Sequence, residues 1–318
     1  MERPLVKLVS DVDIEHALQR VEQVLQRAVQ CDEPLLQRMV AELIHAGGKR
    51  MRPRIALLAF SACGGKPERL DAVIDAAAAC ELIHTASLVH DDIIDQSPLR
   101  RGRPTLHTAY GIPHALVAGD FLFTRGFGLS GRLSRDVIAV TEEACARLAE
   151  GEVMEQRLLA EEIDEERYLQ IVIKKTAEPI RACAKAGALL ADAPPEVVRE
   201  LGEFGIDIGI AFQIADDVLD IAGDPKETGK AVGQDAKTGV LTLPAGIGDD
   251  THTFRKLARE SDPEELRRML VETGAIDKAR AVATRYAERA KARLAVLPPG
   301  PAKDELLALA SSVVKRRS

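Results

Sequence analysis

The sequence ELIHTASLVHDDIIDQSPLRRGRP, residues 81–104, gathers three carboxylates on one side of a predicted helix. Asp91 and Asp95 are four residues apart and Asp92 lies three residues before Asp95, so all three side chains lean over one groove. Like charges at these spacings repel by roughly 0.2–0.5 kcal/mol per pair even in water. Apolar residues precede the carboxylates, and three arginines follow them: Arg100, Arg101 and Arg103. This order favours an apolar wall, a bound cation and an anion that meet in one place; the alternative is a solvated acidic helix end.

The composition of the whole chain favours helices around a large core. Of the 318 residues, 46% are hydrophobic and only 3% are aromatic, and runs of β-branched residues are few. We therefore expect an all-α protein. No break is long or polar enough to be an interdomain linker, which predicts a single domain over residues 1–318. The net charge of −7 and the lack of a long basic tract argue against nucleic acid as a partner.

The cysteines and the apolar runs predict where the protein works. The five cysteines are far apart and form no CxxC pair, which is typical of reduced thiols rather than disulfides or a zinc site. The first residues, MERPLVKLVSD, lack the apolar centre of a signal peptide, and we find no apolar run of about 18 residues. We expect a cytoplasmic protein without a transmembrane segment; peripheral contact with a membrane stays open.

Helical periodicity begins near the amino terminus. Apolar residues recur every three or four positions over residues 12–30, and a second helix is predicted over residues 34–46. Gly47 and Gly48 let the chain turn back after it. A long helix from about residue 67 or 70 leads into the first aspartates, and helical patterns continue to the carboxyl terminus.

The aspartate pattern returns once, in FGIDIGIAFQIADDVLD, residues 204–220. Asp216, Asp217 and Asp220 again follow an apolar helical run. Facing each other across a helical bundle, the two clusters would present hard oxygen ligands to Mg²⁺, which commonly bridges carboxylates and substrate phosphates. The implied ligand is a diphosphate.

These motifs closely resemble those of the trans-isoprenyl diphosphate synthase, or polyprenyl synthetase, family, and the resemblance covers nearly the whole chain. The GGKRxRP turn of the family is present at residues 47–53, the first aspartate motif as HDDIID followed by LRRGRPT, and the second as FQIADDVLD followed by GDPKETGKAVGQD. The resemblance is greatest to the long-chain, heptaprenyl or octaprenyl, synthases. It implies the all-α isoprenoid synthase bundle, with both motifs on facing helices around a deep central cavity.

The resemblance also implies a role for individual residues. Six aspartates would hold Mg²⁺, or Mn²⁺ as a substitute: Asp91, Asp95 and Asp216, together with Asp92, Asp217 and Asp220. Four residues match the positions that hold isopentenyl diphosphate: Lys49, Arg52, His84 and Arg101. Five match the positions around the allylic diphosphate: Arg100, Lys175, Thr176, Gln213 and Lys230. Of these five, Lys175 and Lys230 are counted with the aspartates as catalytic. Arginine and lysine suit phosphate as a bidentate fork and a point charge, respectively; without the resemblance, His84 reads as a core histidine.

The implied reaction needs no side-chain nucleophile, in agreement with the lack of a GxSxG elbow in the sequence. The metal ions and cationic side chains stabilise the departing pyrophosphate, so the allylic C–O bond ionises and the double bond of isopentenyl diphosphate attacks the cation. Loss of a proton, which in this family is thought to go to pyrophosphate, gives an allylic diphosphate that is five carbons longer. Apolar walls keep water from the cation.

Product length is predicted from Ala86 and Ser87, just before the first motif. In the family these positions line the tunnel into which the product grows, and small residues there open the wall roughly 7 Å from the metal end. We expect a product longer than geranylgeranyl diphosphate, from hexaprenyl to decaprenyl diphosphate. A farnesyl or geranylgeranyl diphosphate synthase is the alternative, and tight helix packing is the structural explanation of the small residues.

The chain departs from the family at one residue. After the second motif the family reads DxxxGKxTLP, but Val240 replaces that lysine here, and Lys237 could supply the missing phosphate contact. Similar replacements occur in catalytic subunits of heptaprenyl-type synthases, some of which need a small accessory subunit. A homodimer is the family default, so both assemblies stay open.

Three other functions fit the sequence less well. A class I terpene cyclase usually has NDxxSxxxE as its second motif, which residues 216–220 do not match. A metal-dependent phosphohydrolase would use His90 and Asp91 but needs further histidine ligands. An inactive helical partner subunit is disfavoured by the intact aspartates.

Overall fold

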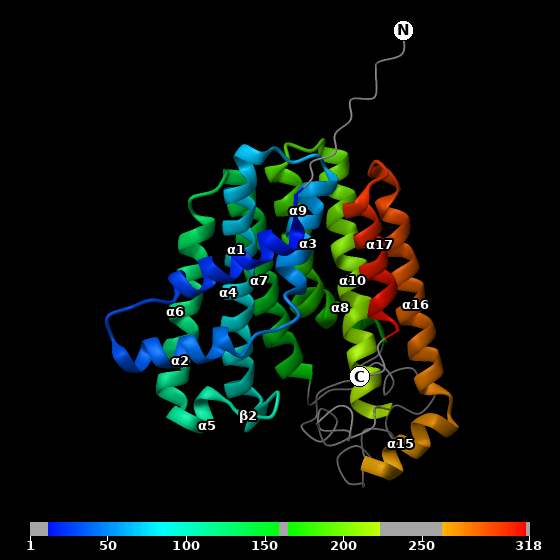
Figure 1. The fold of residues 1–318 in the computed structure, drawn as a ribbon. Helices are drawn as coiled ribbons and strands as arrows, with labels where there is room; N and C mark the ends of the chain where they lie inside the picture. The colour runs from blue at the N-terminus through cyan, green and yellow to red at the C-terminus, as the bar shows by residue number, and fades with distance from the viewer. Residues whose placement is uncertain (1–11, 159–164, 223–262, 316–318) are drawn as a thin grey trace.

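The computed structural model describes residues 12–158, 165–222 and 263–315, and the described chain is a bundle of α-helices with one short hairpin (Figure 1). The helices are α1 (Ile14–Ala28), α2 (Pro34–His45), α3 (Met51–Ala62), α4 (Leu70–Ile94), α5 (Leu106–Tyr110), α6 (Ile112–Ser130), α7 (Arg135–Leu158), α8 (Glu165–Val172), α9 (Glu178–Leu190), α10 (Pro195–Ala222), α15 (Pro263–Glu272), α16 (Ala275–Arg293) and α17 (Pro301–Val313). The hairpin pairs β1 (Leu99–Arg100) with β2 (Arg103–Pro104) in antiparallel register. Short helical turns of other types are η1 (Pro67–Arg69), η2 (Ile173–Ala177) and η3 (Leu294–Val296). The predicted all-α fold is confirmed.

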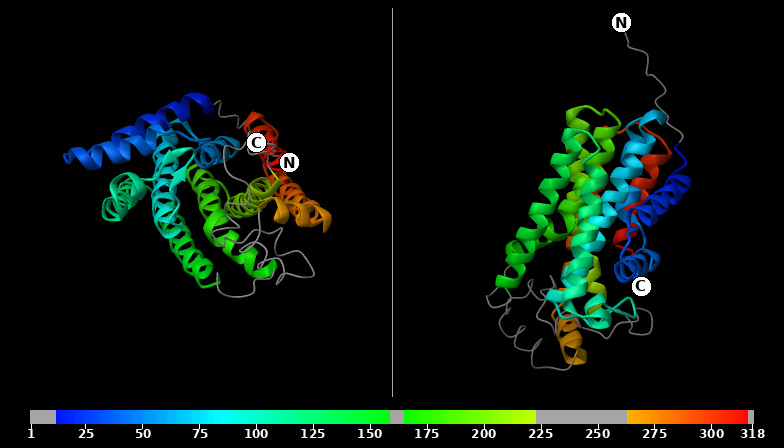
Figure 2. Two further views of the ribbon diagram at one scale, coloured as in Figure 1. Left: turned by 90° about the horizontal axis from the view of Figure 1, so that it is seen from below. Right: turned by 90° about the vertical axis from the view of Figure 1, so that its left-hand side faces the viewer.

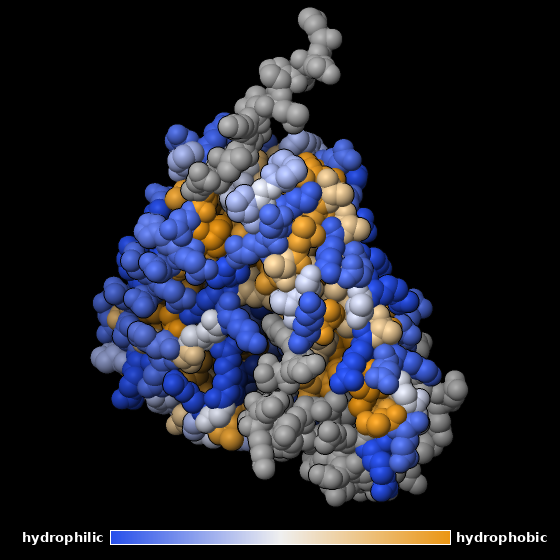
Figure 3. All heavy atoms as spheres, turned by 45° about the vertical axis from the view of Figure 1, so that its right-hand side comes forward, coloured by the Kyte–Doolittle hydropathy of each residue, from blue (hydrophilic) through white to orange (hydrophobic). Residues whose placement is uncertain are grey.

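The long helices stand side by side, and the two aspartate motifs lie at the same end of the bundle. α4 packs on α3, α6 and α9, while α10 packs on α9 and α16. Both α4 and α10 run toward the lower end of Figure 1 and finish there. Figure 2 shows the same parallel stacking from two further directions, and α1 and α2 lie across the long helices. Polar side chains cover most of the face in Figure 3, with apolar strips between them.

The first helices form where the sequence predicts them, with local differences at their starts. Asp13 caps α1, and its carboxylate accepts a hydrogen bond of 2.9 Å from the backbone N–H of His16. α2 begins at Pro34 and ends before Gly47, whose φ of 68° suits a glycine. α3 begins at Met51, after Arg50 in a left-handed conformation with φ of 45°.

α4 owes its apolar composition to its place at the centre of the bundle. Residues Pro67–Ile94 are long and apolar enough to cross a membrane by length and composition alone, a property that our sequence prediction did not anticipate. However, 72% of the most apolar window is buried inside the fold. α4 is therefore explained as a core helix that brings Asp91 and Asp95 to the end of the bundle.

Three glycines let neighbouring helices approach backbone to backbone. A Cβ on Gly187 of α9 would lie 2.2 Å from the carbonyl oxygen of Ala56 in α3. A Cβ on Gly205 of α10 would lie 2.5 Å from the Cα of Arg181 in α9, and one on Gly209 would lie 2.6 Å from the Cα of Ala177, the last residue of η2. Real Cβ atoms essentially never approach this closely. The glycines therefore set the spacing of α3, α9 and α10.

We predict that Gly205→Ala destabilises the protein by about 1–3 kcal/mol, because the new methyl group meets the backbone of α9 and cannot be accommodated by a side-chain rotation. Gly128→Ala on α6 is the matched control, since a Cβ there meets nothing within 4 Å. It should be neutral or stabilise by up to about 1 kcal/mol. Urea denaturation of the two variants measures both values, and equal stability of the two would contradict the close approach.

Candidate active site

The two aspartate motifs line one cavity of ≈ 370 Å³. Asp91 and Asp95 from α4, and Asp216 and Asp217 from α10, form part of its wall, and α7, α8 and η2 close the remaining sides. The predicted arrangement of facing motifs is therefore present. Within the described chain, Asp92 and Asp220 are not part of this wall.

The second aspartate of the first motif holds an arginine. Both carboxylate oxygens of Asp92 accept from Nε of Arg100, at 2.8 and 3.0 Å. Burial raises the pKa of Asp92, and Arg100 opposes that rise. The pair fixes the first of the three arginines that follow the motif, and Arg100 remains in the cavity wall.

The second aspartate of the second motif sits in a hydrogen-bond chain. The Tyr168 hydroxyl donates to Asp217 Oδ2 at 2.5 Å, and Gln213 Nε2 donates to Asp217 Oδ1 at 2.9 Å. The amide oxygen of Gln213 in turn accepts from the Thr176 hydroxyl at 2.9 Å. Three of the predicted site residues are thus joined in one chain of hydrogen bonds, which ends at Tyr168, a residue that the sequence did not predict.

Lys175 is the cation that faces the first motif. Its Nζ lies 2.6 Å from Glu152 and also pairs with Glu155, both on α7. Burial alone would lower the pKa of Lys175, but Glu155 and Asp91 raise it above its ordinary value. Lys175 is therefore a fixed positive charge between two glutamates and the aspartates of α4.

The attraction of nearby cations does not fully offset the cost of burying the charged carboxylates of Asp91 and Asp95. Burial raises the pKa of Asp91 to about 7 and that of Asp95 to about 6, although Lys175 lowers both in part. A divalent cation that prefers oxygen ligands fits this set of carboxylates. No group of three or more His, Cys, Asp or Glu side chains in the described residues gathers closely enough to hold an ion alone.

A local π-helix brings Lys175 and Thr176 into the wall together. Residues 173–177 make wider turns than an α-helix between α8 and α9. π-Helical segments are rare in proteins, and those that occur are frequently found at functional sites. Lys174, the preceding residue, pairs instead with Glu150 outside the cavity.

A second cavity of ≈ 540 Å³ adjoins the first. The two share His84, Leu88, Arg100 and Arg101 in their walls. Burial, followed by the charge of Arg52, lowers the pKa of His84 well below its ordinary value, so its imidazole is neutral. The buried imidazole of His84 therefore adds no positive charge to that of the nearby arginines.

The remaining predicted residues divide into three groups. Arg52 lines the first cavity, and its buried Nε has no hydrogen-bond partner among the described residues, which fits a missing anion. Lys49 is exposed and is not among the described residues that line either cavity. Lys230, Lys237 and Val240 lie outside the described residues.

Of the two predicted product-length residues, Ser87 lines the first cavity and Ala86 does not. Ala86 is fully buried and shares a helix face with Ile83 and His90. Both of those side chains lie against glycines of α6, which places Ala86 at the α4–α6 contact.

A small apolar cavity of ≈ 20 Å³ extends the first one and shares His84 and Leu148 with it. Its wall comes from three helices: Cys80 and Ile83 of α4, Thr141, Ala144 and Cys145 of α7, and Pro179 and Ala182 of α9. Burial raises the pKa of Cys145 to about 12, so its thiol is uncharged.

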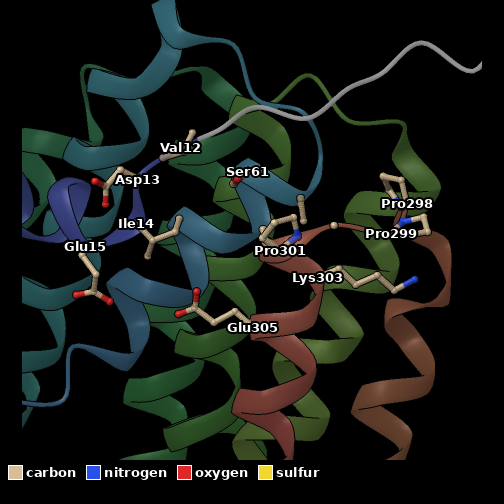
Figure 4. Close-up of a pocket in the computed structure, with 13 residues that line it drawn as sticks. Val12, Asp13, Ile14, Glu15, Ser61, Pro298, Pro299, Pro301, Lys303 and Glu305 are labelled. Atoms are coloured by element: carbon tan, nitrogen blue, oxygen red, sulfur yellow. The ribbon is translucent and has the colours of Figure 1, made fainter.

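A separate groove of ≈ 290 Å³ lies at the amino-terminal ends of α1 and α17 (Figure 4). Its two glutamates, Glu15 and Glu305, both pair with Arg54. The groove contains none of the predicted site residues.

Sequence reasoning missed Tyr168, Glu152 and Glu155. The glutamates are three residues apart on α7, which is the same spacing signal that identified the aspartates. They went unnoticed because the helix carries many other acidic residues. Nothing local to Tyr168 marks it, since its partner lies 49 residues further along the chain.

Comparison with known proteins identifies close relatives. A family model described as polyprenyl synthetase matches residues 33–270. The chain is 38% identical to the short chain isoprenyl diphosphate synthase of Methanothermobacter thermautotrophicus, over 88% of this chain and 90% of that protein. It is 35% identical to the octaprenyl diphosphate synthase of Escherichia coli, over 90% of this chain and 91% of that protein. A crystal structure of a polyprenyl synthase from Caulobacter crescentus, complexed with calcium and isoprenyl diphosphate, superposes with a TM-score of 0.89 at 33% identity over 96% of both chains.

We predict that the metal-free protein loses stability as pH rises from about 4 to about 7. The folded-state pKa values of about 7 for Asp91 and about 6 for Asp95 exceed the value of about 3.9 for a free aspartate. The folded state therefore binds more protons than the unfolded state in this window, and the free energy of unfolding falls as pH rises.

Urea denaturation in EDTA at several pH values measures this slope. Asp91→Asn should show a smaller fall than wild type, whereas Asp136→Asn, at the exposed start of α7, should keep the wild-type slope. Identical slopes in all three proteins would contradict the assignment.

Proposed function

The chain belongs to the polyprenyl synthetase family and is a prenyltransferase, and we propose that it condenses isopentenyl diphosphate with an allylic diphosphate in a Mg²⁺-dependent reaction. The observation that carries the proposal is the meeting of Asp91, Asp95 and Asp216 with Lys175 in one cavity. An arginine-rich cavity adjoins it, as a reaction of two diphosphates requires.

The allylic diphosphate would bind in the first cavity. Bound Mg²⁺ would supply charge neutralisation for the departing pyrophosphate. Lys175 and Arg100 place positive charge in the same cavity. Two glutamates already hold Lys175 in the wall and Asp92 holds Arg100, so neither side chain needs to move far. Ionisation breaks the allylic C–O bond, and the electron pair leaves with pyrophosphate.

Isopentenyl diphosphate would bind across the wall that the two cavities share. The buried Nε of Arg52 has no hydrogen-bond partner among the described residues, and Arg101 lines both cavities. Neutral His84 can donate one hydrogen bond without repelling the arginines. The double bond attacks the allylic cation to form the new C–C bond, and a proton then leaves. Leu88 and Leu148 shield the cation from water.

We propose a long-chain product, from hexaprenyl to decaprenyl. The relatives named above include both a short chain synthase and an octaprenyl diphosphate synthase, so the length must be argued from this chain. Ser87 is small, and the apolar extension beyond it is lined by small side chains of α7 and α9, such as Ala144 and Ala182. No Phe, Tyr or Trp is among the described residues that line this extension, so no bulky ring closes it.

We propose a homodimer in the cytoplasm, with residues 1–318 as one domain. One hydrophobic core cluster runs from Ala17 to Val313, which supports a single domain. α6 exposes several large apolar side chains that a second copy would cover: Ile112, Leu116, Val117 and Phe127. An accessory subunit remains the alternative assembly.

Asp91→Ala and Asp216→Ala should each lower elongation activity by roughly 100-fold or more, because each removes charge stabilisation aimed at the departing pyrophosphate. The measurement is incorporation of radiolabelled isopentenyl diphosphate with Mg²⁺ and an allylic diphosphate. Asp136→Ala, at the exposed start of α7, is the control and should retain activity. Undiminished elongation by both motif variants would contradict the proposal.

Ser87→Phe should shorten the product, because the ring enters the first cavity directly. Ala86→Phe should shorten it less, since Ala86 lies behind that surface and acts by pushing α4 away from α6. Chromatography of the products gives both lengths. An unchanged product distribution in both variants would count against the tunnel.

A further inference from the structure

Tyr168, near the middle of α8, contacts the second aspartate motif although the two are far apart in sequence. Its side chain is 3% exposed, and its hydroxyl donates to Asp217 Oδ2 at 2.5 Å. Burial and the charge of Asp217 raise the pKa of Tyr168 well above its ordinary value, so the hydroxyl keeps its proton. The Tyr168 hydroxyl is therefore a hydrogen-bond donor to Asp217.

The same carboxylate also accepts a hydrogen bond from the side-chain amide of Gln213. The amide oxygen of Gln213 in turn accepts a hydrogen bond from the Thr176 hydroxyl. The chain of hydrogen bonds thus runs from α8 through Asp217 and Gln213 of α10 to the π-helix that carries Lys175. Each buried polar group in the chain has a partner, which makes the network stiff and costly to leave incomplete. It joins three of the elements that line the cavity: α8, α10 and the π-helix.

Both oxygens of Asp217 accept hydrogen bonds from protein donors. In the first motif, Asp92 likewise gives both oxygens to Arg100. The middle aspartate of each motif is therefore held by protein donors on both oxygens, and of the two only Asp217 also lines the cavity with Asp91, Asp95 and Asp216.

We propose that Tyr168 is a positioning residue, whose hydroxyl acts through Asp217 to hold the metal-binding turn of α10 against the π-helix. This inference rests on the proposed function, because it assigns Asp216 to metal binding. Residues that orient metal ligands commonly change metal affinity or activity by 10- to 100-fold when they are altered.

Simple packing is the competing explanation, because Tyr168 also belongs to an apolar cluster with Ile171, Ile214 and Val218. Tyr168→Phe separates the two, since it keeps the ring and removes only the hydroxyl. Tyr286→Phe is the matched control: Tyr286 packs against the same cluster from α16, and its ring lies 4.8 Å from the guanidinium carbon of Arg289.

The test is a titration of Mn²⁺ in the presence of inorganic pyrophosphate, followed by electron paramagnetic resonance, which reads binding without catalysis. Tyr168→Phe should raise the dissociation constant of Mn²⁺ roughly 10-fold, and Tyr286→Phe should leave it unchanged. In steady-state assays, kcat of Tyr168→Phe should fall by about 10-fold while KM for isopentenyl diphosphate stays within about 2-fold. Thermal unfolding in EDTA confirms that both variants are folded.

Asp217→Asn, alone and combined with Tyr168→Phe, tests the path of the effect. If the hydroxyl acts through Asp217, the double variant should be no weaker in Mn²⁺ binding than the weaker single variant. Wild-type Mn²⁺ affinity in Tyr168→Phe, or strictly additive losses in the double variant, would overturn the inference. The proposed function would survive either result as long as Asp91→Ala still abolishes elongation.

Discussion

The structure depends on the attraction between Lys175 and the carboxylates that surround it. Burial makes Asp91 and Asp95 harder to ionise, as their raised pKa values show, and like charges on α4 and α7 add to the cost. Lys175 offsets this cost from inside the cavity, where the Coulomb interaction is less screened than at a surface. The site therefore holds a charge imbalance that a divalent cation and a diphosphate together can relieve. The carboxylates that are costly to bury together are thus the groups that would favour binding of a cation and a diphosphate.

Helix packing far from the chemistry sets the position of Lys175. Gly205 and Gly209 allow α10 to touch the backbone of α9 and of the π-helix, so residues 173–177 lie close to Gln213 and Asp217. A larger side chain at either glycine would move the π-helix outward and stretch the hydrogen bond between Thr176 and Gln213. The close approach of these helix backbones therefore also sets the geometry of the site.

Much of the fold and part of the site could be predicted from the sequence. Apolar periodicity predicted the helices because it records which face of each helix is buried, and the repeated aspartate spacing identified both walls of the cavity because i, i+4 neighbours share a helix face. The roles within each motif could not be separated, because Asp92 and Asp217 differ from their neighbours only in partners that are distant in sequence. The π-helix has no periodic signal, so the joint placement of Lys175 and Thr176 had to come from the structure. Ala86 and Ser87 are equally small, but only tertiary packing shows that one faces the cavity and the other α6.

The central claim is that the two motifs clamp metal ions and a diphosphate between α4 and α10. A crystal structure with Mg²⁺ and an unreactive thiolo analogue of an allylic diphosphate tests it most directly. The account predicts ions that bridge the diphosphate to Asp91 and Asp95 on one side and to Asp216 on the other, with Lys175 against the phosphates. A diphosphate bound without ions between these helices, or ions bound elsewhere, would contradict it.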